Sequence, residues 1–121
     1  MVYVDDNNII SMSRGDSVDL PLFLNAGTDI NPVRYVLQDG DKIYFGIMEP
    51  NQPFENAIVK KVYTKDDFNE NEDVVIKLEP NDTVCLYPGR YYYQVKALFT
   101  NGEENPIINT VVQKTQFFIE E

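Results

Sequence analysis

Apolar and polar residues alternate with a period of two along most of the chain, which is the pattern of half-buried β-strands. We expect strands at residues 9–13, 17–25, 43–48, 57–64, 74–79, 90–100 and 107–120. Side chains two positions apart share one face of a strand, so the apolar set should point into one core. The predicted core residues are Leu20, Leu22, Phe45, Ile76, Leu78, Tyr91, Tyr93, Val95, Phe117 and Ile119, with Tyr91, Tyr93 and Phe117 as the aromatic members.

Turn-forming residues separate these runs. Arg14-Gly15-Asp16 lies between the first two strands, where we expect a three-residue hairpin loop with a positive φ angle at Gly15. Pro88-Gly89 should reverse the chain before a run of tyrosines. These five residues are therefore predicted to form structural turns.

Helix is scarce in this pattern. Residues 64–68 could form one helical turn, and residues 80–86 could form a short helix with Pro80 in its first position. Asp82 and Thr83 are predicted to cap that helix at its exposed amide groups.

Seven or eight short strands in 121 residues favour an all-β fold, an antiparallel immunoglobulin-like β-sandwich with one or two short helical turns. A small barrel is the alternative. Pro21 cannot donate to a β-ladder, so its strand should lie at a sheet edge or carry a bulge. The length indicates one domain, residues 1–121, in which residues 1–8 could form a flexible N-terminal arm.

The charge balance is acidic, because 20 Asp and Glu residues against 10 Lys and Arg residues give a net charge of −10. The basic residues are scattered singly apart from Lys60-Lys61, and no basic stripe is visible that would neutralise a phosphate backbone. Nucleic acid and anionic membranes are therefore not expected as partners. No apolar run reaches the length of a membrane span, and the first residues lack the features of a signal peptide.

The residue types needed for common catalytic sites are missing or poorly placed. The chain has no His, which excludes a Ser-His-Asp triad and a His-ligated zinc ion. The acidic pairs, such as Asp39 with Asp41, do not follow the spacing of a calcium loop and are interpreted as parts of solvated loops. The single cysteine, Cys85, lies between apolar residues and is predicted to be a small buried core residue. We expect no catalytic residue, no metal and no cofactor.

Arg14-Gly15-Asp16 is also the tripeptide that integrins recognise. A tripeptide recurs by chance, however, and two predicted strands flank this one closely. We interpret it as a structural turn, with cell adhesion as the alternative.

Tyrosines are concentrated in residues 87–93 and could stack on the rings of a carbohydrate. Strict alternation instead places Tyr91 and Tyr93 together in the core and leaves Tyr92 exposed. We favour the core interpretation.

Residues 74–95 read VVIKLEPNDTVCLYPGRYYYQV, an alternating strand followed by a proline, a helical turn, Pro-Gly and a Tyr-x-Tyr strand. This stretch resembles the N-terminal domain of the upper baseplate proteins of tailed phages and similar virion β-sandwich domains. The segment SRGDS and the strand after it are similar to the opening hairpin of that family, and TQFFI at residues 115–119 is similar to its last strand. Residues 26–72 match little.

The resemblance implies a structural protein of a phage or prophage virion, a small subunit that docks onto other virion structural proteins in the tail or baseplate. Such a subunit would be made in the host bacterial cytoplasm and would occur in multiple copies in the virion, without nucleic acid or membrane as a partner. Decoration of the capsid surface in the same virion, or a non-catalytic carbohydrate-binding module, are the alternatives.

Overall fold

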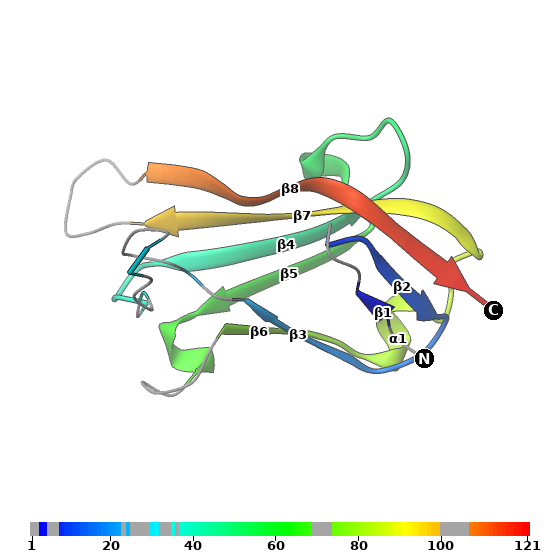
Figure 1. Cartoon of the computed structure of the whole chain (residues 1–121), viewed down its shortest axis with the longest axis horizontal. Helices are drawn as coiled ribbons and strands as arrows, with labels where there is room; N and C mark the ends of the chain where they lie inside the picture. Colours follow the sequence, from blue (N-terminus) through cyan, green and yellow to red (C-terminus); the bar gives the residue numbers. More distant parts are fainter. Residues whose placement is uncertain are drawn as a thin grey trace.

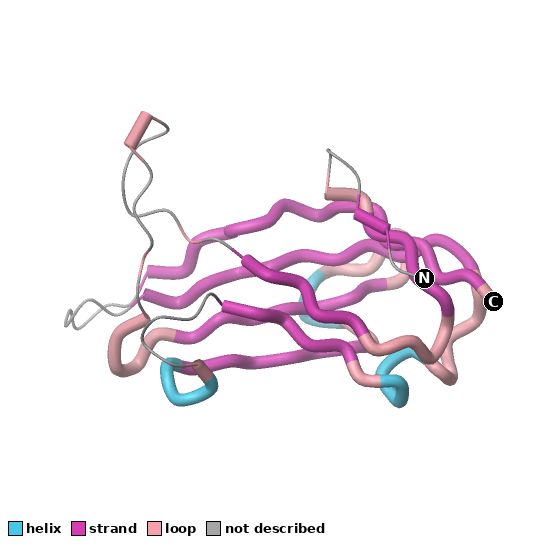
Figure 2. The backbone as a smooth tube through the Cα atoms, turned by 60° about the horizontal axis from the view of Figure 1, so that its bottom comes forward, coloured by secondary structure: helices cyan, strands magenta, loops and turns pink. Residues whose placement is uncertain are grey.

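The computed structural model describes residues 3–4, 8–22, 24, 30–31, 35, 37–68, 74–99 and 107–121. Strands dominate this part of the chain, and the helical segments are single turns (Figure 2). The strands are β1 (Tyr3–Val4), β2 (Ile10–Ser13), β3 (Val18–Leu22), β4 (Lys42–Met48), β5 (Val59–Thr64), β6 (Val74–Leu78), β7 (Gly89–Phe99) and β8 (Ile107–Glu120). The helical turns are η1 (Phe54–Asn56), η2 (Lys65–Asp67) and α1 (Pro80–Thr83). The predicted all-β fold is confirmed.

The strands form two sheets that face each other. A six-stranded sheet, called the long sheet here, has the order β1-β2-β8-β7-β4-β5, and a two-stranded sheet, the short sheet, pairs β3 with β6 (Figure 1). In an immunoglobulin-like sandwich, β3 and β6 take the places of strands B and E, while β4, β5, β7 and β8 take those of C, C′, F and G. β1, α1 and the last residue of β8 lie at the same end of the sandwich (Figure 1).

The predicted hairpin around Arg14-Gly15-Asp16 is wrong. β2 pairs with β8 and β3 pairs with β6, so the loop carries the chain from one sheet to the other. Met12 on β2 and Val18 on β3 are both buried, and each covers the core from its own side. A short loop fits a hairpin and a crossover equally well, so burial of the two apolar faces decides between them. β2 also runs parallel to β8, an exception to the predicted antiparallel order.

The N-terminal segment contributes a strand. β1 lies within the predicted arm of residues 1–8 and pairs with β2, placing Tyr3 opposite Ser11. Residues 1–2 and 5–7 of that arm lie outside the described residues.

The core follows the predicted alternation. Eight of the ten predicted core residues are buried, and they come from β4, β6, β7 and β8. Phe45, Tyr93 and Phe117 form an aromatic row with ring centroids 6.0 Å apart at each step. Leu20 and Leu22 are only half-buried, because they line an open side of the sandwich that is described below.

A loop covers part of the outer face of the long sheet. Gly46 on β4 faces outward, and the Phe54 ring of η1 packs against it, so closely that a Cβ on Gly46 would lie 2.9 Å from the Phe54 ring. Met48, two positions further along β4, is fully buried. β4 is therefore covered on both faces.

Asp41 is fully buried, so its interpretation as part of a solvated loop is wrong. Its carboxylate accepts hydrogen bonds from the Tyr35 hydroxyl at 2.6 Å and from the Gln38 backbone N–H at 2.9 Å. The ring of Tyr35 packs edge-on against Phe99, with centroids 5.1 Å apart. A buried carboxylate needs such donors, which a sequence pattern of acidic turn residues does not reveal.

Burial, the hydrogen bond to Asp41 and the charge of that carboxylate raise the pKa of Tyr35 from 10.0 to about 12. The folded state thus disfavours the tyrosinate form, and the resulting stability is complete below pH 10 and is lost as the pH rises to about 12. We expect the free energy of unfolding to fall over this interval. Tyr35→Phe should lower it by about 1–3 kcal/mol at neutral pH, because Asp41 loses a donor, and should flatten the alkaline decline.

Urea denaturation from pH 8 to 12 measures both effects. Tyr91, whose pKa is also raised, chiefly by burial, is present in both proteins, so the difference between them isolates Tyr35. Identical alkaline slopes in the two proteins would contradict the assignment.

Candidate functional site

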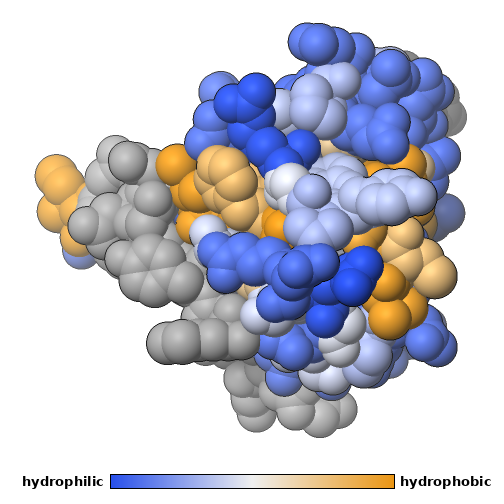
Figure 3. Space-filling view, turned by 90° about the vertical axis from the view of Figure 1, so that its right-hand side faces the viewer, coloured by the Kyte–Doolittle hydropathy of each residue, from blue (hydrophilic) through white to orange (hydrophobic). Residues whose placement is uncertain are grey.

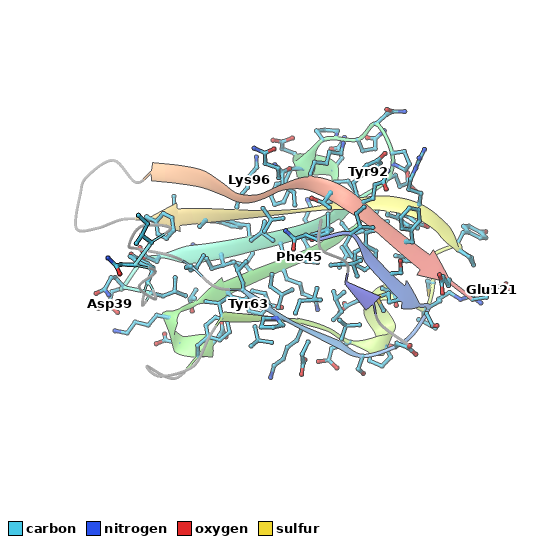
Figure 4. All side chains as sticks on the ribbon, in the orientation of Figure 1. Asp39, Phe45, Tyr63, Tyr92, Lys96 and Glu121 are labelled. Carbon is cyan, nitrogen blue, oxygen red and sulfur yellow. The ribbon has the colours of Figure 1, made fainter. Side chains whose placement is uncertain are left out.

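One long side of the sandwich, between β5 and β6, is closed by polar contacts. The Lys77 backbone N–H on β6 donates to the Tyr63 hydroxyl at 3.0 Å, and that hydroxyl donates to the Lys77 carbonyl at 3.4 Å (Figure 4). Further along, the ammonium group of Lys61 lies 2.8 Å from the carboxylate of Asp82. These contacts join the edge of the long sheet to the edge of the short sheet and to α1.

The opposite long side is open. A cleft of about 450 Å³ lies between β3 and the β7–β8 part of the long sheet. Its lining is mostly apolar and consists of Asn8, Ile10, Leu20, Pro21, Leu22, Phe45, Ile76, Tyr93, Val95 and Val112. A volume of this size is within the range of ligand-binding clefts. The cleft exists because a two-stranded sheet is too narrow to cover all the strands that face it.

A polar contact fixes one end of this cleft. The Tyr93 hydroxyl donates a hydrogen bond to the carbonyl of Asn8. Asn8 has a φ angle of 65°, which bends the chain just before β2. The contact holds the start of β2 in place where the cleft begins.

The outer edge of β8 borders the cleft and is largely unpaired. β2 pairs only with residues 117–120 of β8. No other described strand lies beside residues 107–116 on the side away from β7. Among the described residues, this stretch therefore has backbone N–H and C=O groups without a strand partner next to an apolar cleft, except that the Gln113 carbonyl accepts a hydrogen bond from the Thr115 hydroxyl at 2.7 Å.

The facing edge of β3 is less suited to strand pairing. Lys77 directs its N–H and C=O toward Tyr63, away from β3, so Lys77 and its partner Asp19 form a non-hydrogen-bonded pair. Pro21, two residues after Asp19 on β3, directs its backbone groups to the same side as Asp19, which is the free edge. Because proline has no backbone N–H, this edge lacks a donor there. Proline on an edge strand discourages the addition of another strand.

The edge of β5 is protected in a different way. Lys60 and Lys61 lie on this edge strand, and lysines discourage edge-to-edge pairing. Among the described edges, the 107–116 stretch of β8 is therefore the one that combines length, free backbone groups and an adjacent apolar surface.

The residues of the first predicted turn, Arg14, Gly15 and Asp16, lie at the end of the sandwich that carries α1. Arg14 is exposed, and its backbone N–H donates to the Glu120 carbonyl at 2.7 Å. Gly15 has a φ angle of 82°, and its N–H donates to the Thr83 hydroxyl at 2.9 Å. The N–H of Asp16 donates to the Ser13 carbonyl at 3.2 Å, which closes the turn.

The predicted cap of α1 is partly wrong. Glu79 is the N-cap residue, and the carboxylate of Asp82 accepts the Glu79 backbone N–H at 2.7 Å, so Asp82 does stabilise the start of the helix. Thr83 is fully buried and binds Gly15, 68 positions away in the sequence. Its hydroxyl joins α1 to the crossover loop, a long-range partner that local spacing cannot identify.

The second predicted turn leads into β7. Pro88 is exposed and Gly89 is the first residue of β7. The hydroxyl of Tyr91 donates to the Tyr87 carbonyl at 2.7 Å, four residues upstream. This is the arrangement of a tyrosine corner at the E–F connection of immunoglobulin-like domains. Tyr91, Tyr93 and Phe117, predicted as core aromatics, are 8%, 5% and 0% exposed.

Cys85 is exposed, so the prediction of a buried core cysteine is wrong. It lies just after α1, in a turn whose flanking residue Val84 is also exposed. Within the described ranges, no three Cys, Asp or Glu side chains are grouped as metal ligands. No helix in the same ranges is long and apolar enough to cross a membrane.

The tyrosines do not form a flat exposed platform among the described residues. Tyr87 is 83% exposed. Tyr92 is half-buried and lies beneath two cations, with Arg90 at 6.0 Å and Lys114 at 5.3 Å from its ring centroid.

Comparison with models of known protein families, with characterised proteins and with solved structures finds no match for this chain. The strands form an all-β sandwich, and the hydrogen bond of Tyr91 to Tyr87 resembles the tyrosine corner of immunoglobulin-like domains. The short sheet of two strands distinguishes it from the four-stranded sheet of the constant-type arrangement.

The backbone conformation of the crossover loop, residues 14–16, can be tested by substitution. Gly15→Val should lower the free energy of unfolding by about 1–3 kcal/mol, because a β-branched residue is strained at a φ angle of 82°. The space beside Gly15 is open, since the nearest atom to an added Cβ is 3.8 Å away on Val84, so strain and not collision is the cause. Chemical denaturation measures the loss.

Ser17→Val is the matched control, because Ser17 is exposed and has no positive φ angle. We expect little change in that variant. Equal stability of the two valine variants would show that the conformation of Gly15 contributes nothing.

Proposed function

We propose that this chain is a non-catalytic structural subunit that docks onto other proteins through the open side of its sandwich. The observation that carries the proposal is the apolar cleft beside the unpaired edge of β8. Leu20 and Leu22 remain half-buried there, although they continue the inward alternation of β3. A partner would complete a core that the short sheet leaves incomplete.

The geometry favours an extended segment of the partner as the docking element. Such a segment would pair with residues 107–116 of β8 and place alternate side chains into the cleft. Backbone hydrogen bonds would supply affinity, and the shape of the cleft would select the side chains, as in other cases of strand addition. Strand addition needs no catalytic group, metal or cofactor.

The proposed setting is the virion of a phage or prophage, in the tail or baseplate, with other virion structural proteins as partners. This part of the proposal is supported by the resemblance of residues 74–95 to virion β-sandwich domains. The segment forms β6, α1, the tyrosine corner and most of β7, which are architectural elements. Decoration of the capsid surface would use the same docking chemistry and is the alternative location.

A carbohydrate-binding module has less support. Sugar-binding sites of this kind need two or three aromatic rings that face solvent together. Tyr87 is strongly exposed, but Tyr91 and Tyr93 are buried and Tyr92 lies beneath two cations. We therefore retain docking to protein as the proposed function.

Val112→Glu tests the docking site, because Val112 lines the cleft and is partly buried. We expect this variant to bind the other purified virion proteins about tenfold more weakly or worse, since a carboxylate would replace an apolar contact. Light scattering coupled to size exclusion measures complex formation. Hydrogen exchange at residues 107–116 should slow in the wild-type complex.

Val62→Glu is the matched control. Val62 lies on β5, the lysine-protected edge, and is 53% exposed. This variant should bind like the wild type, and thermal melts should show that both variants are folded. Normal binding by a folded Val112→Glu variant, or unchanged exchange in the complex, would contradict the proposed site.

A further inference from the structure

The sheet register gathers half of the basic residues on one face. β4, β5 and β7 contain no Asp or Glu, and the single acidic residue of β8 is its last one, Glu120. The buried residues Ile43, Phe45 and Ile47 alternate with outward positions on β4, which fixes the outward positions of the strands beside it. The cations at outward positions, which we call the basic face, are Lys42, Lys60, Arg90, Lys96 and Lys114.

These cations are held in place by groups that do not neutralise them. Lys114 donates to the Gln52 carbonyl at 3.0 Å, and Lys60 donates to the Glu55 carbonyl at 2.9 Å. Lys96 lies 4.9 Å from the centre of the Phe54 ring.

The Tyr92 ring collects two further contacts of this kind, from Arg90 and Lys114. Among the described residues, no cation of the basic face has a carboxylate within ion-pair distance. The loop between β4 and β5, which covers part of this face, carries the exposed acids Glu49 and Glu55. Five cations against these two carboxylates make the face positive in a chain whose net charge is −10.

The sandwich end that carries α1 and the C-terminus has the opposite character. Glu79, Glu120 and Glu121 are exposed there, with Arg14 as a nearby exposed cation and Arg90 where this end meets the basic face. Tyr87 and Val84, at 83% and 47% exposure, supply apolar surface between the acids. This end is mostly hydrophilic with apolar patches (Figure 3), and Glu121 marks it opposite Asp39 at the far end (Figure 4). We call it the α1 end.

We propose that the basic face of one copy of this chain binds the α1 end of a second copy. The two surfaces are complementary, because carboxylates and an exposed tyrosine meet cations and the Tyr92 ring. They adjoin at Arg90, which pairs with Phe118, but are otherwise different surfaces, so the contact is heterologous and can continue from copy to copy as a ring or a filament. The contact uses a surface separate from the cleft and does not depend on what occupies the cleft.

Salt should affect this contact in an unusual way. Two copies, each with a net charge of −10, repel at long range, while the contact itself is attractive at short range. The screening length is about 30 Å at 0.01 M salt, about 10 Å at 0.1 M and about 3 Å at 1 M. Association should therefore be strongest near 0.1 M salt, weaker in dilute salt because of repulsion, and weaker in concentrated salt because the contact is screened.

Sedimentation velocity of the full chain, over a range of protein and salt concentrations, measures this dependence. Lys96→Glu, in the middle of β7 and away from the α1 end, should weaken association about tenfold or more near 0.1 M salt, because it places like charges together at the contact. Lys77→Glu is the matched control, since it changes the charge equally at an exposed position of β6 in the short sheet, and it should change association by about twofold at most.

A mixing experiment tests the polarity of the contact. The second variant combines Tyr87→Ala with Glu121→Lys and disables the α1 end. Each variant alone should stay monomeric, but an equimolar mixture with Lys96→Glu should form dimers and nothing larger, because one intact face meets one intact end. Thermal melts of all variants establish that they are folded.

Three outcomes would overturn the proposal. The first is a wild-type chain that stays monomeric at every salt concentration. The second is self-association of Lys96→Glu equal to that of the wild type, or a mixture that remains monomeric. The third is a monomeric wild type whose basic face instead binds an anionic polymer, measured with a single-stranded oligonucleotide and lost in Lys96→Glu.

Discussion

A sheet of two strands has to cover a sheet of six, and the rest of the structure follows from this mismatch. The inner face of the long sheet extends beyond the two strands of the short sheet on both sides, so each side needs some other closure. On the β5–β6 side, Tyr63 spans the gap and satisfies both backbone groups of Lys77. On the β3–β8 side no such side chain is present among the described residues, and the cleft results. The proposed docking site is thus the part of the core that the two strands of the short sheet do not cover.

The ends of the sandwich depend on contacts that join distant parts of the chain. Thr83 offers its buried hydroxyl to the Gly15 N–H, and the Arg14 N–H reaches the Glu120 carbonyl. The crossover loop, α1 and the last strand are thereby fixed together. Because the loop crosses between sheets, β2 is free to pair with the end of β8 and leaves the earlier part of β8 unpaired. The loop contacts therefore help to determine where the open edge lies.

Period-two alternation was sufficient to predict the strands other than β1 and most of the core, because inward positions on long strands such as β7 have no other way to be buried. It failed where the answer depends on contacts between distant residues. The partner of β2, the burial of Asp41 and the role of Thr83 each require a residue far away in space or in an adjacent loop. The predicted burial of Cys85 was wrong because apolar neighbours in the sequence do not imply burial when the residue lies in a turn. The cleft could not be foreseen, since strand count per sheet is a property of pairing and not of pattern.

The same alternation that builds the core also sorts the charges, and this is hidden in the linear sequence. Lys42, Lys96 and Lys114 are far apart along the chain, yet the register of β4, β7 and β8 brings them to one face. β4 and β7 contain no Asp or Glu, and most acidic residues lie in turns and at strand ends. Net charge describes the long-range field of the molecule, whereas recognition depends on the charge within about one screening length of a surface. A strongly acidic chain can therefore carry a basic binding face, and the register of its strands determines where that face lies.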